Sequence, residues 1–412
     1  MNARRIVLVS PGWPRAAFAN GIVSYVDNLK RAFEAAGREV RVASYANARG
    51  GEEAVLIRGA FAGRGAPARL ATRVGWKLAP GLAERVFGAL DARTAFRDLY
   101  RAWPFDLAEI EESRGESLWV ARAVPAAVVL RLHGPWFLNA AARGAPADAA
   151  FETMVAREGK AIARAEAVSS PSRDVLERVR QRYGLALPDA VVIPNPGPEP
   201  DPRAQWRRES AEPGLIAFVG RFDRHKGGDL VVEAFVKLAA AGRRVRLAFA
   251  GRDDGVLDEA GRRWPFSEYL AERVPAGLRG AIEFLGQVEP QKLLELRQRA
   301  NVVVFASRYE IFGLTLVEAM AQGCPLVAAD AGSCREIVED GRSALLFRAG
   351  DPASLAGRIE VLLDHPERAA ELGARALADY RARFLPEPIA KATLQFYEDV
   401  LARRAAKVKR AG

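Results

Sequence analysis

The chain has few cysteines and few histidines. Of its 412 residues, two are cysteine and three are histidine. Two cysteines cannot build a disulfide framework, so we expect Cys324 and Cys334 to be small packed thiols in a reducing compartment. The sequence contains no Cys/His cluster, no aromatic platform and no nucleic-acid motif. Nucleic acid is therefore not an expected partner.

Long apolar runs are also missing. Residues 119–132 are mostly apolar but are interrupted by Arg122 and Arg131, whereas a membrane-spanning helix needs about 18 consecutive apolar residues. The stretch before Pro11 has only four consecutive apolar residues, which is shorter than the core of a secretion signal. We therefore expect a cytoplasmic protein.

Acidic residues are scarce in one segment of the first half. The chain carries a formal net charge of +10, and between Arg58 and Arg101 nine basic residues stand against three acidic ones. Leucine, valine, tryptophan and phenylalanine are interleaved with these charges. Such a segment can rest on an anionic membrane surface. It is equally well interpreted as an arginine-rich, solvated face.

The rest of the chain has the pattern of an α/β protein. Half of the residues are hydrophobic and 27% are charged, which is typical of globular proteins, and the length is sufficient for two domains. Short apolar runs lie at 6–9, 40–43, 105–110, 127–132, 167–169, 191–193, 215–219, 245–250, 282–285, 302–305 and 325–328. Loops and helical patterns separate these runs. The alternation predicts two doubly wound, Rossmann-like parallel-sheet domains that face a cleft.

A proline-rich stretch divides the two halves. Six prolines lie between Pro194 and Gly214 without hydrophobic periodicity, which is typical of an extended linker. The helical pattern near the end of the chain is expected to pack back onto the first domain. The predicted parts are a first domain over 1–196, a linker over 197–213, a second domain over 214–388, and a final helix within 389–412.

Two acidic side chains follow the apolar run 302–305. Glu310 lies in the loop after this run, and Glu318 lies in the first turns of the helix that we expect to open near Thr315. Ligands of open α/β sheets bind at the carboxyl ends of the strands. Each carboxylate can accept paired hydrogen bonds from the vicinal diol of a sugar or a ribose. Taken alone, the pair is equally well explained as a loop charge and a complement to the helix dipole.

The loop 220–228 has the chemistry of a phosphate site. It offers Arg221 and Lys226 beside three glycines, directly before a helical pattern. Fixed cations, bare backbone N–H groups and a helix N-terminus all favour phosphate. Combined with the two glutamates, this loop outlines a site for a nucleotide-activated sugar. A third strand end, at Gly332 and Ser333, can add backbone amides for phosphate or sugar oxygens.

The first half offers fewer candidates. His133 follows the run 127–132, where an imidazole can donate to a substrate oxygen or, more commonly, serves a structural role. The G-x-G-x-x-G fingerprint is absent, so a dinucleotide cofactor is not indicated. In the second half, the adjacent Asp253 and Asp254 are interpreted as a turn rather than a metal pair.

Several motifs together resemble those of retaining glycosyltransferase family 4, which has the GT-B fold. In the second half they are Gly220-Arg221-Phe222 with Lys226-Gly227, Phe284-Leu285-Gly286, Ser307 to Met320, Gly323 to Val327 and Gly332 to Ile337. In the first half they are sparser, namely Pro11-Gly12, Asn20-Gly21, His133-Gly134 and Ile193 to Pro196. One position departs from the family pattern, because Asn20 stands where the family has the first glycine of a Gly-Gly pair. Its side chain narrows the space for phosphate or acceptor.

The resemblance implies roles for the matching residues. Arg221 and Lys226 would hold the donor diphosphate. Glu310 would bind hydroxyls of the transferred sugar and Glu318 the nucleotide ribose, while His133 would contact the sugar from across the cleft. Further donor-binding residues are expected to be Gly21, Gly220, Phe312, Gly313, Leu314, Gly332 and Ser333. The resemblance also implies that neither a cofactor nor a metal ion is required.

These features predict a glycosyltransferase that moves a sugar from a nucleotide diphosphate to an acceptor hydroxyl with retention of configuration. The expected acceptor is a carbohydrate or a lipid-linked molecule of cell-envelope polysaccharide, lipopolysaccharide or glycolipid synthesis. The expected location is the cytoplasm, with the basic segment as a candidate contact to the inner face of the membrane. Three alternatives remain open: a non-catalytic nucleotide-sugar sensor or partner subunit, a GT-B sugar-nucleotide epimerase, and a basic module that binds membranes or polyanions.

Overall fold

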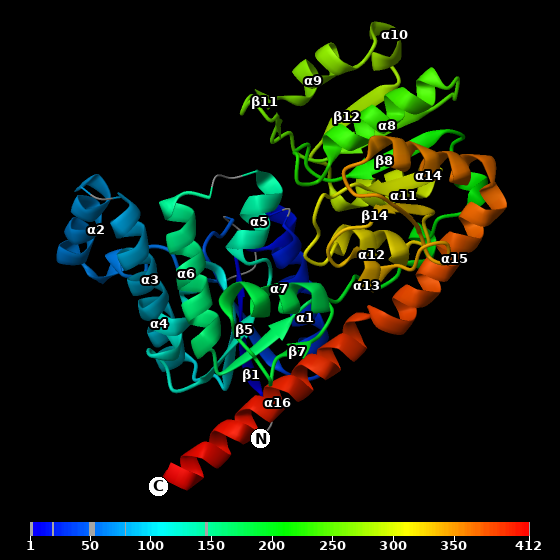
Figure 1. The fold of residues 1–412 in the computed structure, drawn as a ribbon. Helices are drawn as coiled ribbons and strands as arrows, with labels where there is room; N and C mark the ends of the chain where they lie inside the picture. The colour runs from blue at the N-terminus through cyan, green and yellow to red at the C-terminus, as the bar shows by residue number, and fades with distance from the viewer. Residues whose placement is uncertain (1–2, 19, 49–53, 79, 145–146, 412) are drawn as a thin grey trace. The chain divides into compact units, whose positions relative to one another are not determined.

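The computed structural model describes residues 3–18, 20–48, 54–78, 80–144 and 147–411. The chain divides into two compact units. Unit 1 comprises 1–138, 147–196 and 386–412, and unit 2 comprises 139–146 and 197–385. Each unit is built on a parallel sheet with helices on both faces (Figure 1). The predicted α/β class with two doubly wound sheets is therefore confirmed.

Unit 1 contains a seven-stranded sheet in the order β3-β2-β1-β4-β5-β6-β7, in which neighbouring strands are parallel. The strands are β1 (Arg5–Ser10), β2 (Glu39–Ser44), β3 (Val55–Leu56), β4 (Leu107–Glu111), β5 (Ala127–Arg131), β6 (Ala167–Ser170) and β7 (Val191–Val192). The direction in which the strand order grows reverses between β1 and β4. In open sheets such a switch point is where ligands bind.

The helices of unit 1 cover two separate apolar clusters. These helices are α1 (Gly21–Ala35), α2 (Ala66–Leu78), α3 (Pro80–Ala102), α4 (Ser117–Ala121), α6 (Ala149–Arg164), α7 (Arg173–Tyr183) and α16 (Pro386–Ala411). Helix α5 (Trp136–Arg143) contributes residues to both units. On one face α16 packs against α1, with the rings of Phe33 and Tyr397 5.9 Å apart. On the other face α3 and α4 pack on the sheet. Helix α16 begins earlier than expected, because Pro386 is compatible with the first helical turn.

Unit 2 contains a six-stranded parallel sheet in the order β12-β9-β8-β13-β14-β15. Its strands are β8 (Leu215–Val219), β9 (Arg246–Ala250), β12 (Ile282–Gly286), β13 (Val302–Phe305), β14 (Leu326–Ala329) and β15 (Leu345–Phe347), and β10 (Val256–Leu257) pairs with β11 (Arg263–Trp264) in an antiparallel hairpin. Its helices are α8 (Gly228–Ala240), α9 (Phe266–Arg273), α10 (Ala276–Arg279), α11 (Pro290–Arg299), α12 (Leu314–Ala321), α13 (Cys334–Ile337), α14 (Pro352–Asp364) and α15 (Pro366–Arg383).

The continuous apolar run of β13 reflects burial on both faces. Val302 and Val304 point into one apolar cluster, while Val303 and Phe305 point into the cluster on the opposite face. A parallel strand between two helical layers needs apolar residues at every position. The switch point of this sheet lies between β8 and β13. The loops that follow these two strands therefore emerge side by side.

Within the described ranges, no helix combines the length and apolar character that crossing a bilayer would require.

Candidate functional site

The loops after β8 and β13 meet at the switch point of unit 2. Gly227 lies between the β8 loop and α8 with a φ of 72°, in the left-handed region that glycine adopts most readily. A Cβ atom here would lie 2.0 Å from the carbonyl oxygen of Ala306, which follows β13. Only glycine allows the two backbones to approach this closely. The close approach places Lys226 beside the loop that carries Glu310.

Lys226 and Glu310 form a largely buried ion pair. The distance from Lys226 Nζ to Glu310 Oε2 is 2.8 Å, and the two side chains are 25% and 13% exposed. The Ser307 hydroxyl donates to the same carboxylate oxygen over 2.9 Å. The Lys226 N–H donates to Asp223 Oδ1 over 2.6 Å, which fixes the lysine backbone. The structure thus brings together two residues that are 84 positions apart in the sequence.

The charge state of Glu310 follows from these contacts. Burial acts to raise the pKa of this carboxyl group. The charges of Lys226 and His225, with the hydrogen bonds from Lys226 and Ser307, outweigh burial and lower the pKa to about 2. Glu310 is therefore ionised across the physiological pH range and can only accept hydrogen bonds.

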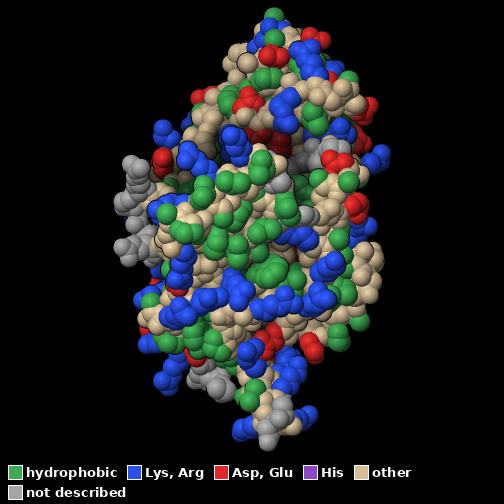
Figure 2. Space-filling model, turned by 90° about the vertical axis from the view of Figure 1, so that its left-hand side faces the viewer, with side chains coloured by type: hydrophobic (Ala, Val, Ile, Leu, Met, Phe, Trp, Pro, Cys, Tyr) green, Lys and Arg blue, Asp and Glu red, His purple; other side chains and the backbone are tan. Residues whose placement is uncertain are grey.

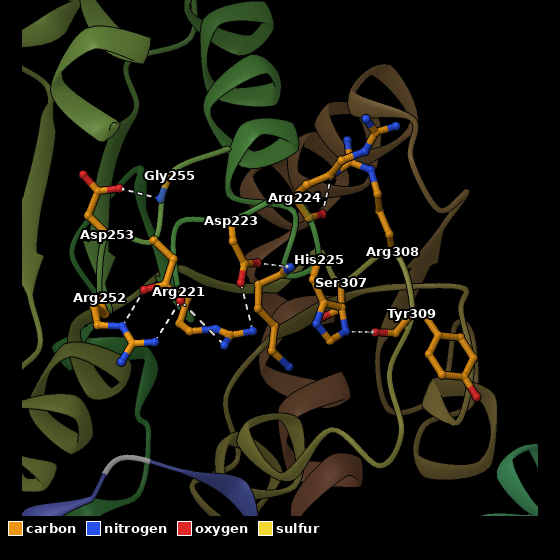
Figure 3. A network of polar contacts seen from close by, with 12 residues as sticks. Arg221, Asp223, Arg224, His225, Arg252, Asp253, Gly255, Ser307, Arg308 and Tyr309 are labelled. Carbon is orange, nitrogen blue, oxygen red and sulfur yellow. Dashed lines mark hydrogen bonds and ion pairs between the residues drawn. The ribbon is translucent and has the colours of Figure 1, made fainter. Parts of the chain in front are cut away.

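Arg221 lies in the same loop between two aspartates (Figure 3). Its guanidinium is 2.9 Å from Asp223 Oδ2 and 3.6 Å from Asp254 Oδ2, and its side chain is 27% exposed. Asp253 instead accepts the N–H groups of Gly255 and of the first residue of α9. The carboxylate of Asp253 therefore stabilises a turn. The two aspartates around Arg221 orient its guanidinium at the carboxyl edge of β8.

Sequence reasoning missed the contacts that tie the two loops together. His225 Nε2 lies 2.9 Å from the carbonyl oxygen of Tyr309, and the Arg308 N–H donates to the carbonyl oxygen of His225 (Figure 3). The Arg308 guanidinium forms a two-pronged ion pair with Asp229 in α8, at 2.8 and 2.6 Å. Burial and the neighbouring charge of Lys226 lower the pKa of His225. The His225 imidazole thus helps to hold the loop of Glu310.

Glu318 is held by a buried arginine that the sequence analysis also missed. Arg297 in α11 is 2% exposed, and its guanidinium lies 2.9 Å from Glu318 Oε2 and 3.4 Å from Gln322 Oε1. A guanidinium fixes a carboxylate in direction as well as in position. In the sequence, this contact is indicated only by the position of Arg297, whose charge lies on the buried side of α11 between Leu296 and Ala300.

The other predicted residues of unit 2 lie around Glu310. Ser333 is fully buried and donates both its N–H and its hydroxyl to the carbonyl oxygen of Glu310. Gly332 has a φ of 53°, and a Cβ atom there would lie 2.2 Å from that same oxygen. Gly313 caps α12 in the left-handed region. The remaining three are Gly220, whose N–H donates to Ala250, and the buried apolar residues Phe312 and Leu314. Their donor-binding roles stay predictions.

His133 and Gly21 belong to unit 1. His133 follows β5, its ring packs edge-on against Tyr25 at 4.8 Å, and burial followed by the charge of Arg131 lowers its pKa well below the usual value. Gly21 is the first residue of α1, and the Asn20 side chain accepts the N–H of Ile22 over 2.8 Å. Asn20 therefore caps a helix, which explains its presence at this position.

Buried glutamates surround the His133 loop. Glu112 accepts the N–H groups of His133 and Gly134 over 2.9 and 2.7 Å, and Glu158 accepts the N–H of Trp136 over 2.7 Å. Burial is the main cause that raises the pKa of Glu112 to about 7. Burial, together with repulsion from Glu112, raises the pKa of Glu111 to about 8 and that of Glu158 to about 9. Sequence reasoning singled out the histidine and missed these acids.

A cavity of about 660 Å³ lies elsewhere in unit 2. It is lined by residues of β8, β9, β12 and α11, such as Leu215, Leu247 and Ile282. None of the predicted site residues lines it. The groups with phosphate- and sugar-binding chemistry therefore lie at the open carboxyl edge of the sheet and not in this cavity.

Two family models match this chain, one in each half. The model for glycosyl transferases group 1 matches residues 202–379, and the model for the glycosyl transferase 4-like domain matches residues 20–196. These ranges contain the loops of Arg221 and Glu310 and the loop of His133.

Individual similar proteins are also glycosyltransferases or share the fold. The chain is 32% identical over 270 residues to the D-inositol 3-phosphate glycosyltransferase of Stackebrandtia nassauensis. The matched region covers 63% of this chain and 59% of that protein. The chain thus matches somewhat more than half the length of this curated relative. The structure of sucrose-phosphate synthase from Thermosynechococcus elongatus has a TM-score of 0.73 at 21% identity and covers 97% of this chain and 100% of its own.

A third similar protein is Anabaena Alr3699/HepE in complex with UDP and glucose, with a TM-score of 0.70 at 17% identity over 96% of this chain and 100% of its own. At these identities the solved structures show the fold, and the two family models together cover both units. The chain therefore belongs to glycosyltransferase family 4, the glycosyl transferases group 1, and has the GT-B fold.

Proposed function

We propose that this protein is a glycosyltransferase that moves a sugar from a nucleotide diphosphate donor to an acceptor hydroxyl with retention of configuration. One observation carries the proposal: a buried Lys226–Glu310 ion pair, with Arg221 in the same loop, lies at the switch point of the unit 2 sheet. Fixed cations for a diphosphate and a permanently ionised acid for hydroxyl groups thus lie side by side.

The proposed chemistry depends on the charge of the leaving group. Breaking the bond between sugar and phosphate leaves negative charge on the diphosphate. Arg221 and Lys226 are held in place before the reaction, and a preorganised donor of this kind contributes about 3–4 kcal/mol to transition-state stability. Glu310 would accept hydrogen bonds from sugar hydroxyls. The departing phosphate would take the proton of the acceptor hydroxyl as the acceptor attacks from the same face.

Glu318 would bind the hydroxyls of the nucleotide ribose. Arg297 already occupies one carboxylate oxygen and fixes the direction of the other. The proposed reaction needs no cofactor and no metal ion, because the two cations of the β8 loop supply the positive charge.

Similar proteins support a uridine diphosphate sugar as the first donor to test. The solved structure of Alr3699/HepE holds UDP and glucose, and the Stackebrandtia relative is named for glycosyl transfer to D-inositol 3-phosphate. We place the activity in the cytoplasm, in the synthesis of a cell-envelope polysaccharide or glycolipid.

The test is release of nucleoside diphosphate by the full chain from a panel of UDP-, GDP- and ADP-sugars, with and without pools of polyol, oligosaccharide and lipid acceptors. The proposal expects release that depends on an acceptor, and a product with the anomeric configuration of the donor in NMR spectra. Donor binding without turnover would instead identify a sensor or partner subunit. Release without any acceptor would identify an epimerase.

A further inference from the structure

The basic segment between Arg58 and Arg101 folds into the helix pair α2 and α3 on the outside of unit 1. The two helices pack closely, because a Cβ atom on Gly75 of α2 would lie 2.5 Å from the ring of Phe87 in α3. In Figure 1 the pair lies at the outer left of unit 1, beside α4 and α6. The opposite side of α2 is exposed to solvent.

The exposed side of α2 carries an apolar stripe. Leu70, Val74 and Leu78 are spaced by four residues, so they share one face of the helix, and they are 63%, 44% and 77% exposed. Trp76 is also exposed. Six of the twelve large hydrophobic side chains found exposed in the described residues lie between positions 70 and 86. Contiguous exposed apolar surface of this kind marks an interaction site.

A basic stripe runs directly beside the apolar one. Arg69, Arg73 and Lys77 precede the three apolar residues by one position each, and all three are exposed. Within the described residues, none of them takes part in an ion pair. Figure 2 faces this side of unit 1 and shows hydrophobic side chains gathered together with Lys and Arg side chains around them. The cations are therefore available to an external anion.

A second exposed apolar surface lies in a groove on α3. Leu82, Val86 and Leu90 of α3, together with Trp119 of α4, line a cavity of about 350 Å³ with Arg93 at its side. The guanidinium of Arg122 lies 5.7 Å from the centre of the Trp119 ring. Leucine, valine and tryptophan next to arginine are the residues with which helices lie in the boundary layer of a bilayer.

We propose that α2 and the adjoining groove of α3 bind the surface of an anionic phospholipid bilayer. The apolar stripe would enter the boundary between headgroups and acyl chains, and the basic stripe would contact lipid phosphates. An anionic membrane matches both stripes at once. A nucleic acid would match only the cations, and a purely apolar protein surface would match only the leucines. This docking surface is separate from the chemistry of unit 2.

The experiment is flotation of the full chain with phosphatidylcholine vesicles that contain or lack phosphatidylglycerol. Binding is expected only to vesicles that contain phosphatidylglycerol, and it should weaken as salt is added. Each cation near an anionic surface contributes about 1 kcal/mol. The combined variant Arg69→Gln, Arg73→Gln and Lys77→Gln should therefore lower the partition coefficient about 100-fold.

Two further variants separate charge from apolar contact. The combined change Leu70→Gln, Val74→Gln and Leu78→Gln keeps all charges and should lower binding at least about 10-fold. A matched control, Lys292→Gln, Arg368→Gln and Arg381→Gln, removes three exposed cations of unit 2 and should bind as the wild type does. Gln is a good helix former, so α2 should keep its helical structure, which circular dichroism checks.

Fluorescence locates the contact. Lipids brominated in their acyl chains should quench the emission of a tryptophan placed in the stripe by Val74→Trp, beyond the quenching seen with the bound wild type. Wild-type binding by both α2 variants, or no added quenching in Val74→Trp, overturns the proposal. So does self-association that disappears with the leucine changes, because the stripe would then be an interface between copies of the chain.

Discussion

Near the carboxyl edges of the two sheets lie glutamates whose pKa values are shifted in opposite directions. In unit 1, burial raises the pKa of Glu111, Glu112 and Glu158, and repulsion from Glu112 adds to the rise in the other two, although backbone N–H groups act to lower the pKa of Glu112 and Glu158. In unit 2, Glu310 is also largely buried, with 13% of its side chain exposed, yet the lysine of the neighbouring loop helps to lower its pKa to about 2. A partner on the adjacent strand end, rather than burial itself, therefore decides whether a buried acid is ionised.

The largest expected effect comes from removing that partner. Lys226→Ala leaves the buried carboxylate of Glu310 without its cation and removes one donor to the leaving diphosphate. We expect kcat to fall at least about 100-fold and the free energy of unfolding to fall by about 3 kcal/mol. The measurements are steady-state nucleoside diphosphate release and urea unfolding of the full chain.

A matched control for this change is Lys237→Ala. Lys237 is an exposed lysine on α8, the helix that follows Lys226, and its loss should leave kcat within about twofold, as is usual for surface changes. Wild-type turnover in Lys226→Ala would remove the lysine from the mechanism.

The raised pKa values in unit 1 predict a loss of stability at alkaline pH. An acid with a higher pKa in the folded than in the unfolded chain favours folding fully below the unfolded pKa of 4.5, and this contribution is lost as pH rises through the folded pKa of about 9. The free energy of unfolding should therefore fall between pH 5 and pH 9, and Glu158→Gln should reduce the fall by on the order of 2 kcal/mol.

Urea unfolding at several pH values between 5 and 9 measures this difference. Glu387→Gln, at an exposed position of α16, serves as the control and should keep the wild-type pH dependence. If Glu158→Gln keeps it as well, Glu158 is ionised in the folded protein and the contrast between the two sheet edges disappears.

A smaller effect tests how closely the two loops of unit 2 approach. Gly227→Ala introduces a Cβ atom 2.0 Å from the carbonyl oxygen of Ala306 at a positive φ. Gly242→Ala has a φ of 81° but no atom within 4 Å of its new Cβ. Both changes place an alanine at a positive φ, and this backbone cost is common to the two variants. The steric contact at Ala306 should therefore make Gly227→Ala less stable than Gly242→Ala by about 1–2 kcal/mol. Equal melting temperatures would show that the loops are farther apart.

The smallest effect concerns the orientation of Glu318. Arg297→Met removes the guanidinium that holds this carboxylate, and we expect the Kd of the nucleoside diphosphate to rise about 10-fold, which is the loss of about one well-placed hydrogen bond. Arg297→Lys should restore part of the affinity, whereas Lys292→Gln on the same helix should leave it unchanged. Titration calorimetry gives these constants, and an unchanged Kd in Arg297→Met would separate Glu318 from ribose binding.

Much of the fold was predictable because its signals are local. The apolar run of β13 and the glycine-rich loop before α8 can each be recognised within ten residues, and both were predicted at the correct positions. The short strand β15, the β10–β11 hairpin and the helices α9 and α10 were not predicted, because segments of two to eight residues carry little periodicity.

The candidate site was predictable only in part. The sequence indicated Lys226 and Glu310 separately, and their residue types were sufficient to predict phosphate and hydroxyl binding. It did not reveal that Arg297 holds Glu318 or that Glu112 holds the His133 loop. Those contacts join residues 21 positions apart through the packing of separate elements, and no local pattern records such a partner.

The most direct test is a crystal structure of the full chain with the nucleotide sugar that the turnover panel selects. We expect diphosphate oxygens within about 3 Å of the cationic groups of Arg221 and Lys226, and a sugar hydroxyl donating to Glu310. A bound donor whose diphosphate lies away from both cations, with Glu310 turned to solvent, would contradict it.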